Sequence, residues 1–270
     1  EPEIYSIKGL KAFLKLAEQK NLDSYPIHIK LDTGMHRLGF EANTIQELIS
    51  TLKGNHRVAV QSILSHMATS DAEEHKAFSL SQIRLFDELS SQLMSELGIQ
   101  PIRHILNTSG ISNFPEGQYD MVRLGIGLYG VSNDTKEQKY LENVSSLKSV
   151  ISQIRTIPAG DSVGYGRRFM AHESTTVATI PIGYADGISR LWGNEVGYVT
   201  INQQKAPILG SVCMDMLMVN VNGIECAEGD PVVVFGESPT VMEMAQKTQT
   251  IPYEILTSIS QRVKRVFYRE

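Results

Sequence analysis

The feature that most limits the possible folds is a change of sequence rhythm near residue 144. Before it, short apolar runs alternate with amphipathic stretches whose apolar residues recur at helical spacing. After it, apolar runs are separated by turns rich in glycine, asparagine and proline, and helical spacing returns only near the end. The first rhythm is typical of βαβ units in a parallel sheet, and the second of an antiparallel sheet. The sequence therefore predicts an α/β part followed by an all-β part.

The first part is expected to alternate strands with helices. The expected helices lie at residues 7–20, 44–54 and 75–98. The last two end in Gly54 and Gly98, and glycine is common at helix C-termini. The expected strands lie at residues 26–32, 59–66, 102–107 and 121–126.

A polar stretch rich in turn-forming residues, 131–143, separates the two parts. We expect the domain boundary there, and we assign residues 1–140 to the first domain and residues 141–270 to the second. No internal repeat or low-complexity segment interrupts either part.

The composition argues against several classes of protein. The 270 residues carry a formal net charge of −5 and no long basic block, which argues against binding nucleic acid or an anionic membrane. No run approaches the roughly 18 apolar residues of a membrane span. The two cysteines, Cys213 and Cys226, lie outside any metal-ligand pattern, and we expect reduced thiols of a cytoplasmic protein. No metal site is expected.

One charged residue interrupts an apolar run. The stretch DMVRLGIGLYG, residues 120–130, has the spacing of a short buried strand, and Arg123 lies within it. A guanidinium stays protonated, so burying it without a partner is costly. On periodicity alone, an edge position with the side chain reaching water explains Arg123 as well as a buried partner does.

Further polar residues collect at the expected carboxyl ends of strands, where α/β proteins place their sites. They are residues 32–37, His66 and residues 107–109. Taken singly, each has an ordinary explanation: Lys30 and Arg37 as surface cations, and His66 as a strand-end histidine. In the second part, strand packing explains Tyr165, and a hairpin turn explains Tyr184 and the residues after it.

The motifs are more specific in combination. In order along the chain stand KLDTGMHRLGF, SHMATSD, NTSG, MVRLGIGLYG, VGYGRRF, PIGYADG, APILGSVCMDM and IPYEILTSISQRVKRVF. Their order and spacing resemble the alanine racemase family from residue 4 to the end of the chain. These are fold-type III enzymes that use pyridoxal 5′-phosphate (PLP), with an (α/β)8 barrel and a C-terminal β domain. The resemblance implies a cytoplasmic isomerase that supplies D-alanine for peptidoglycan.

The resemblance also gives Arg123 a partner. In the family, the arginine of this motif hydrogen-bonds the pyridine nitrogen of PLP. Arginine can only donate, so that nitrogen must accept and remain unprotonated. Such a ring is a weaker electron sink than one paired with a carboxylate, which limits side reactions of the substrate α-carbanion.

Racemisation needs acid–base groups on the two faces of a planar carbon, and the resemblance assigns one of them. Tyr165 matches the family's tyrosine base, and His66 matches the histidine of a histidine–arginine pair that assists it. A free phenol is a poor base at neutral pH, so this assistance is needed. Arg37 and the backbone of Met214 match groups at the substrate carboxylate. Lys30 matches a lysine that is carbamylated in several members and then orients that arginine.

The remaining matches concern the cofactor and the subunit interface. The family's phosphate-binding positions are matched by Thr108, Gly125, Ile126 and Tyr253, and Asn107 matches a polar contact near the cofactor. Tyr184 matches a tyrosine that narrows the site entrance. Family enzymes are homodimers in which Tyr165, Tyr184 and Met214 serve the partner's cofactor, so the resemblance implies shared sites for a small amino acid substrate.

The family's PLP-binding lysine motif, similar to VKANAYGHG, is absent from this sequence. We therefore expect the chain to match the C-terminal two-thirds of a family member, and to be inactive by itself. Four strand candidates, where a closed barrel needs eight, predict a half TIM-type barrel followed by the antiparallel β domain.

Two other functions remain open at this stage. The chain could belong to a non-catalytic PLP-binding homologue or accessory domain, or to another fold-type III amino-acid racemase or decarboxylase. Retention of Arg123, Tyr165, His66 and Arg37 favours an active parent enzyme over the non-catalytic homologue.

Overall fold

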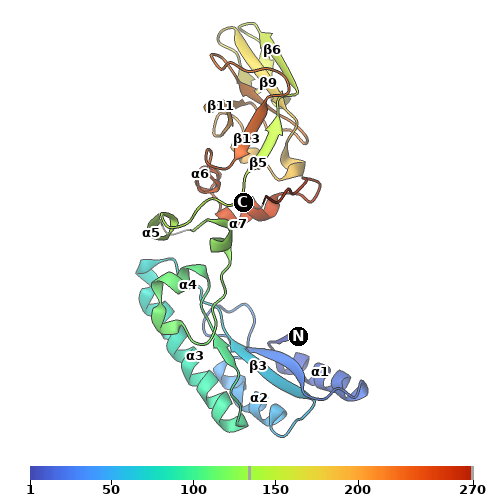
Figure 1. Ribbon diagram of the computed structural model, residues 1–270, viewed down its shortest axis with the longest axis vertical. Coiled ribbons are helices and arrows are strands. Elements are labelled where there is room, and N and C mark those ends of the chain that lie inside the picture. Colours follow the sequence, from blue (N-terminus) through green and yellow to red (C-terminus); the bar gives the residue numbers. More distant parts are fainter. Residues whose placement is uncertain (133–134, 269–270) are drawn as a thin grey trace. The chain divides into compact units, whose positions relative to one another are not determined.

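The chain, seen in a computed structural model that describes residues 1–132 and 135–268, divides into two compact units (Figure 1). The first is Glu1–Gly127 and the second is Leu128–Glu270. The stretch where we expected the domain boundary, 131–143, includes residues 133 and 134, which lie outside the described residues. The two units are described separately below.

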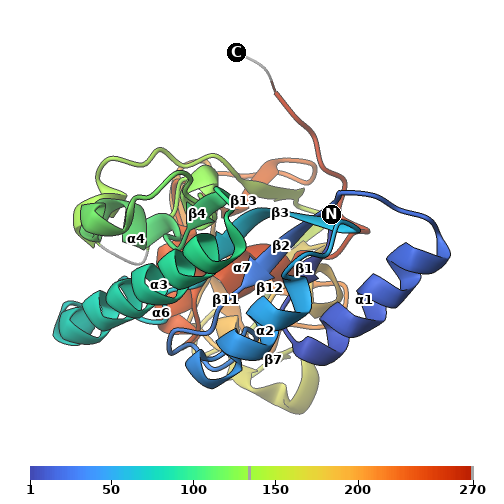
Figure 2. The same ribbon diagram turned by 90° about the horizontal axis from the view of Figure 1, so that it is seen from below.

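The first unit is built on a four-stranded parallel sheet in the order β1-β2-β3-β4. The strands are β1 (Glu3–Ile4), β2 (Tyr25–Lys30), β3 (Val58–Leu64) and β4 (Ile102–His104). The helices are α1 (Ile7–Gln19), α2 (Ile45–Leu52), α3 (Lys76–Leu97) and α4 (Thr108–Asn113). Helices α1, α2 and α3 alternate with the strands and lie along one face of the sheet (Figures 1 and 2). The predicted βαβ arrangement is confirmed.

Hydrophobic periodicity explains how this layer packs. In β2, Ile27 and Ile29 are buried in one core with Phe86 of α3, because alternate strand residues point to the same face. The intervening residues, His28 and Lys30, therefore point to the face opposite the helices. The expected stop of α3 is also confirmed, since Gly98 follows it with the left-handed φ of 67°.

The prediction of a buried strand at residues 121–126 is wrong. This segment has no regular secondary structure, and Met121 and Leu124 are 41% and 48% exposed. It runs beside β4 through two hydrogen bonds, from Asp120 N–H to the Arg103 carbonyl (3.1 Å) and from Arg123 N–H to the Leu106 carbonyl (3.0 Å). A short 3-10 helix, Ile126–Tyr129, follows directly and ends the extended run. The fourth strand of the sheet is instead the two-residue β1.

The second unit is mainly an antiparallel sheet of seven strands in the order β5-β13-β10-β11-β12-β9-β6. Its strands are β5 (Leu147–Val150), β6 (Gln153–Ile157), β9 (Thr175–Ile180), β10 (Tyr198–Ile201), β11 (Gln204–Leu209), β12 (Leu217–Asn220) and β13 (Pro231–Phe235). A two-stranded ribbon is formed by β7 (Ser162–Val163) and β8 (Phe169–Met170). The helices are α5 (Thr135–Gln138), α6 (Val241–Lys247) and α7 (Pro252–Ser258). The predicted antiparallel β part is confirmed.

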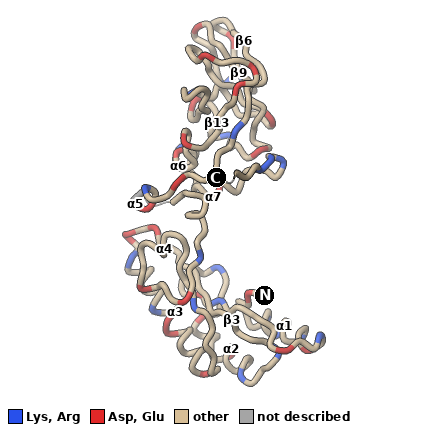
Figure 3. The backbone as a smooth tube through the Cα atoms, viewed as in Figure 1, with Lys and Arg blue, Asp and Glu red and all other residues tan. Residues whose placement is uncertain are grey.

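The surface and the cores of both units are those of an ordinary folded protein. Trp192 is fully buried at the centre of the second unit's core, and Phe86 is fully buried in the first. Acidic and basic residues are interspersed along the backbone of both units (Figure 3). Among the described residues, no helix is long and apolar enough to cross a bilayer.

Candidate active site

Arg123 lies half-buried at the carboxyl ends of β3 and β4, held by its own chain. Its Nη2 donates to the carbonyls of Ser65 (2.6 Å) and Ile105 (3.1 Å), and its Nη1 donates to the carbonyl of His104 (3.3 Å). Two imidazoles complete the surroundings: Nη1 also contacts Nδ1 of His104, and Nη2 lies 3.3 Å from Nδ1 of His66. Within the described part of the chain, the remaining donor, Nε–H, has no acceptor.

The two imidazoles beside Arg123 are kept neutral. Burial, followed by the positive charge of Arg123, lowers the pKa of His104 from 6.5 to about 4. The pKa of His66 is lowered to about 4 by burial first, and then by the charges of Arg123, Arg37 and Lys30. Since a guanidinium can only donate, a neutral Nδ1 is the acceptor that it requires. Arg123, His66 and His104 together therefore carry a single positive charge, which is on Arg123.

His104 continues a hydrogen-bond chain across the face of the sheet opposite the helices. Because its Nδ1 accepts from Arg123, its Nε2–H donates to Oγ of Ser62 on β3 (3.2 Å). The Ser62 hydroxyl then donates to Nδ1 of His28 on β2 (2.7 Å). Ser62 is 2% exposed and His104 is 5% exposed. The donor-only arginine thus fixes the tautomers of His104 and His28 and the direction of the Ser62 hydroxyl between them.

A buried glutamine fixes the loop that carries His66. Gln82 of α3 is fully buried. Its side-chain oxygen accepts from Ala68 N–H (2.9 Å), and its amide nitrogen donates to the His66 carbonyl (3.1 Å). Both partners are backbone groups, so Gln82 fixes the path of the main chain at His66 rather than its ring.

Lys30 and Arg37 lie near this cluster but differ in their contacts. The Lys30 side chain is 12% exposed, and its ammonium group donates to Glu3 at 3.0 Å. Arg37 is exposed on a loop after β2. That loop is ordered by Asp32, whose Oδ1 accepts from Gly34 N–H (2.9 Å) and His36 N–H (3.1 Å). In the described structure, the Lys30 ammonium group therefore pairs with Glu3.

Thr108 collects backbone donors at the end of β4. It is 3% exposed, and its Oγ1 accepts from Gly125 N–H (2.9 Å) and from Gly127 N–H (3.4 Å). The preceding residue, Asn107, accepts through Oδ1 from Gly110 N–H (3.1 Å) and from the Ser70 hydroxyl (2.7 Å). Asn107 thus caps α4, while Thr108 holds the glycine-rich segment. The two N–H groups converge on a single oxygen, which is the arrangement that an oxyanion requires.

The other predicted site residues belong to the second unit. Tyr165 is 76% exposed in a short turn after β7, and Tyr253 in α7 is 40% exposed. Tyr184 (44% exposed) and Met214 (54%) lie on adjacent loops. Tyr184 N–H donates to the Cys213 carbonyl (3.0 Å) and Ala185 N–H to the Met214 carbonyl (3.0 Å). The unit thus brings Tyr184 and Met214 together.

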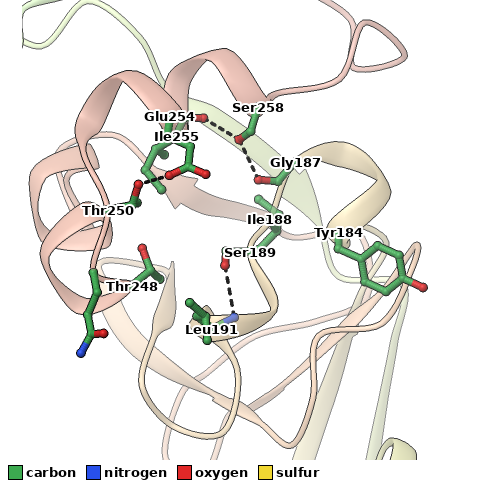
Figure 4. Close-up of a pocket in the computed structure, with 11 residues that line it drawn as sticks. Tyr184, Gly187, Ile188, Ser189, Leu191, Thr248, Thr250, Glu254, Ile255 and Ser258 are labelled. Carbon is green, nitrogen blue, oxygen red and sulfur yellow. Dashed lines mark hydrogen bonds between the residues drawn. The ribbon is translucent and has the colours of Figure 1, made fainter.

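A pocket of about 450 Å³ lies beside Tyr184 (Figure 4). Its walls include Ile188, Leu191, Thr250 and Glu254. The Ser258 hydroxyl closes one side by donating to the Gly187 carbonyl (3.1 Å). In Figure 4 the phenol ring of Tyr184 extends away from the other lining residues, so the ring remains available to a group outside this pocket.

Two family models match almost all of the chain. "Alanine racemase, N-terminal domain" matches residues 1–133, and "Alanine racemase, C-terminal domain" matches residues 144–267. Alanine racemase from Helicobacter acinonychis (strain Sheeba) is 38% identical over 279 residues, which cover 98% of this chain and 73% of the relative. The chain belongs to the alanine racemase family. Alanine racemase from Sorangium cellulosum (strain So ce56) is 36% identical, over 100% of this chain and 73% of the relative.

Solved alanine racemases share the fold. The enzyme from Streptomyces coelicolor A3(2) superposes with a TM-score of 0.91 at 28% identity, over 99% of this chain and 72% of that chain. The enzyme from Bartonella henselae, described with covalently bound pyridoxal phosphate, gives a TM-score of 0.86 at 32% identity, over 99% and 73%. The fold is therefore that of an alanine racemase, with a barrel-like N-terminal part and a C-terminal antiparallel β domain.

These comparisons confirm the predicted family, its isomerase class and its dependence on PLP.

Of the predicted site residues, the first unit brings His66 and Arg123 into contact and brings Thr108 to the backbone of Gly125. Sequence reasoning missed His104 and Gln82. A signal for His104 existed, because it is a histidine next to the apolar Ile105 and Leu106 at the expected strand of residues 102–107. Gln82 gives no such signal, because a polar residue is ordinary in an amphipathic helix such as α3.

Proposed function

We propose that this chain carries the greater part of an alanine racemase, which interconverts L- and D-alanine by removing the Cα proton and returning it to the opposite face. The relatives and the solved structures named above support this proposal at the level of the family. The observation that carries it within the chain is the Arg123 cluster. Its terminal nitrogens are held by backbone carbonyls and two neutral imidazoles, and one N–H is left for a ligand.

The residues of the first unit fit the cofactor that the family uses. Arg123 Nε–H would donate to the pyridine nitrogen, which must then be an unprotonated acceptor. Thr108 and the N–H groups of Gly125 and Ile126 would hold the phosphate, and Asn107 directly precedes Thr108 in the chain. The resemblance to the family adds Tyr253 of the second unit to the groups that bind the phosphate. When bound, PLP withdraws electrons from the substrate's Cα and makes its proton removable. Because Arg123 cannot release a proton to the ring, the cofactor acts as a moderate electron sink.

Tyr165 is the acid–base residue that we assign to this chain. We infer that its phenolate oxygen takes the Cα proton of one enantiomer and that, in the reverse reaction, its phenol returns a proton to that same face, while the second base serves the opposite face. His66, whose Nδ1 accepts from Arg123, assists Tyr165. Arg37 and the Met214 backbone would bind the substrate carboxylate, and Tyr184 would narrow the entrance. Lys30 stays a candidate for carbamylation. Conversion of its ammonium group into an anion would end the ion pair with Glu3 and allow one with Arg37.

The second base is the family's PLP-binding lysine, and the sequence of this chain contains no such motif. We therefore propose that the 270 residues correspond to the C-terminal two-thirds of the enzyme, with half of a barrel in residues 1–140 and the β domain in residues 141–270. By themselves they lack a base on the lysine face of Cα. We expect no racemase activity from this chain alone.

We further propose a homodimer with shared sites. Three of the proposed site residues, Tyr165, Tyr184 and Met214, are large side chains that are 44–76% exposed in the single chain, and exposed groups of this kind are typical of subunit interfaces. A partner subunit would cover them. The enzyme would act in the cytoplasm and supply D-alanine for peptidoglycan, and the free state of both cysteines supports that location.

A racemase assay tests the proposal. The chain alone should show no interconversion of L- and D-alanine above background. The same chain fused behind a segment with the family's lysine motif should racemise alanine, and the fused Tyr165→Phe variant should not. A rate proportional to the concentration of the lone chain would refute its inactivity. A folded, PLP-loaded fusion without activity would refute the function.

A further inference from the structure

Arg262 joins the two loops that carry Tyr184 and Met214. Its Nε donates to Oδ1 of Asp186 at 2.7 Å, and its Nη2 donates to Oδ1 of Asp215 at 2.6 Å. Asp186 lies two residues after Tyr184, and Asp215 directly follows Met214. A single guanidinium thus binds one carboxylate from each loop. Charge-assisted bonds of this length are among the stronger hydrogen bonds in proteins.

The backbones of the two loops also pack closely. A Cβ atom at Gly183 would lie 2.3 Å from the Cys213 carbonyl oxygen and 2.4 Å from the Met214 carbonyl oxygen, so only glycine fits. Together with the two backbone bonds at Tyr184 and Ala185, this contact couples the loops along one short stretch. The Arg262 bridge adds a second connection on the carboxyl-terminal side of both Tyr184 and Met214.

Asp186 depends on this bridge. It is 8% exposed, and its second oxygen accepts from Gly183 N–H at 2.8 Å. Burial raises the pKa of Asp186, but the hydrogen bonds from Arg262 and Gly183 outweigh it, so the pKa lies below its ordinary value. The same bonds to Asp186 and Asp215 raise the pKa of Arg262. A buried carboxylate that lost its cation would be costly, and Asp186 is such a carboxylate. The Asp215 side chain is 54% exposed and the Arg262 side chain is 47% exposed, so the Arg262–Asp215 arm is a surface ion pair.

Arg262 is itself held in place by a turn after α7. Arg265 donates through Nη2 to the Ile259 carbonyl (2.7 Å) and through Nη1 to the Val263 carbonyl (2.7 Å). Ser260 N–H donates to the Asp186 carbonyl at 3.0 Å. The turn therefore presents Arg262 to the loops from a fixed backbone.

We propose that Arg262 is a positioning residue, which fixes the loops of Tyr184 and Met214 against each other and thereby sets the substrate-carboxylate side of the site. The inference rests on the proposed function, because that function gives Tyr184 and Met214 their roles. Arg262 itself lies beyond any contact with the substrate assigned above and acts through the two aspartates.

Amide hydrogen exchange of the chain as it exists tests the bridge. In Arg262→Gln, the amides of Tyr184 and Ala185 should exchange about tenfold faster or more, the effect expected for lost hydrogen bonds to charged groups. Amides of β6 and β9 in the same unit should keep their rates, which separates local loosening from general destabilisation. The matched control is Lys264→Gln, which removes an exposed charge two residues away. Unchanged exchange at Tyr184 and Ala185 would overturn the proposal.

The effect of Arg262 on substrate binding is tested in the fusion proposed above, in which this chain follows a segment with the family's lysine motif. We call this protein the lysine-completed fusion. Arg262→Lys keeps the charge but loses the planar fork that places Nε and Nη2 on separate carboxylates, and Arg262→Gln loses both the fork and the charge. KM for alanine should therefore rise in the order wild type, Lys, Gln, with a smaller change in kcat. Faster exchange without any rise in KM would overturn the positioning role. An inactive wild-type fusion would instead refute the proposed function, while the exchange experiment would still decide whether the bridge exists.

Discussion

Replacing Arg123 by glutamine should change the titration of two histidines that are far from Arg123 in the sequence. Both His66 and His104 are neutral neighbours of the guanidinium, and the pKa of each lies at about 4 instead of 6.5. Arg123→Gln removes the charge but keeps a side chain able to donate hydrogen bonds. We expect both pKa values to rise toward 6.5.

The expected size of the rise in pKa follows from which cause lowers the pKa more. Burial is the larger cause for both imidazoles, and the charge of Arg123 comes second. Since glutamine leaves the burial in place, the pKa of His104 should recover less than half of the difference between about 4 and 6.5. A rise to 6.5 would mean that burial plays no part.

The same shift makes the folded state sensitive to acid. Between pH 6.5 and about 4 the unfolded chain takes up a proton at His104, whereas the folded chain does not. Stability is therefore lost as the pH falls through this window. For His104, which is 5% exposed, the loss reaches about 3 kcal/mol near pH 4, at about 1.4 kcal/mol for each pH unit. In Arg123→Gln the loss over this window should be smaller.

Proton and nitrogen NMR of the histidine rings, titrated from about pH 8 to about pH 3, measures both values directly. Arg84→Gln is the matched control, because it removes an exposed charge from α3 of the same unit. If His104 titrates near 6.5 in the wild-type chain, the description of the Arg123 cluster is wrong. If Arg84→Gln moves the histidines as much as Arg123→Gln does, the effect is general rather than local.

Three further outcomes are expected. Gln82→Leu should lower the free energy of unfolding of the first unit by about 1–3 kcal/mol, measured by urea denaturation, because Ala68 N–H and the His66 carbonyl lose their partner. A loss below about 0.5 kcal/mol would contradict the role of Gln82. Thr108→Val should speed amide exchange at Gly125 while Thr108→Ser should not, since only serine keeps the accepting hydroxyl; equal exchange in both variants would refute the contact. Phe86→Ala should lower the free energy of unfolding by about 3–5 kcal/mol in the same urea assay, because the ring is fully buried. A loss below about 1 kcal/mol, which is typical of exposed positions, would place the ring outside the core.

The sequence was most informative where a pattern extends over many residues. The helical spacing of α3 and its glycine stop define an element of 22 residues, and the structure has it where the pattern predicts. The strand expected at 121–126 failed because a six-residue run with four large apolar residues does not distinguish a buried strand from an irregular segment. The two-residue β1 is too short to leave any pattern.

The site shows the same limit at the level of single contacts. Arg123 and His66 were identified because the motifs that contain them resemble those of the family. The motifs could not reveal that Ser62 links His104 to His28, since this link depends on the register of three strands. Nor could they pair Arg262 with Asp186, which is 76 residues away in the chain. Such contacts are set by folding in three dimensions rather than by spacing.

The proposed function depends on Arg123 donating to the ring nitrogen of the cofactor, which then carries no proton. Nitrogen-15 NMR of PLP labelled in the ring and bound to the lysine-completed fusion tests this most directly. We predict the chemical shift of an unprotonated, hydrogen-bonded pyridine nitrogen at neutral pH. In Arg123→Gln the same nitrogen should have a different chemical shift, because its hydrogen-bond donor has changed. A protonated pyridinium signal in the unsubstituted protein would contradict the account.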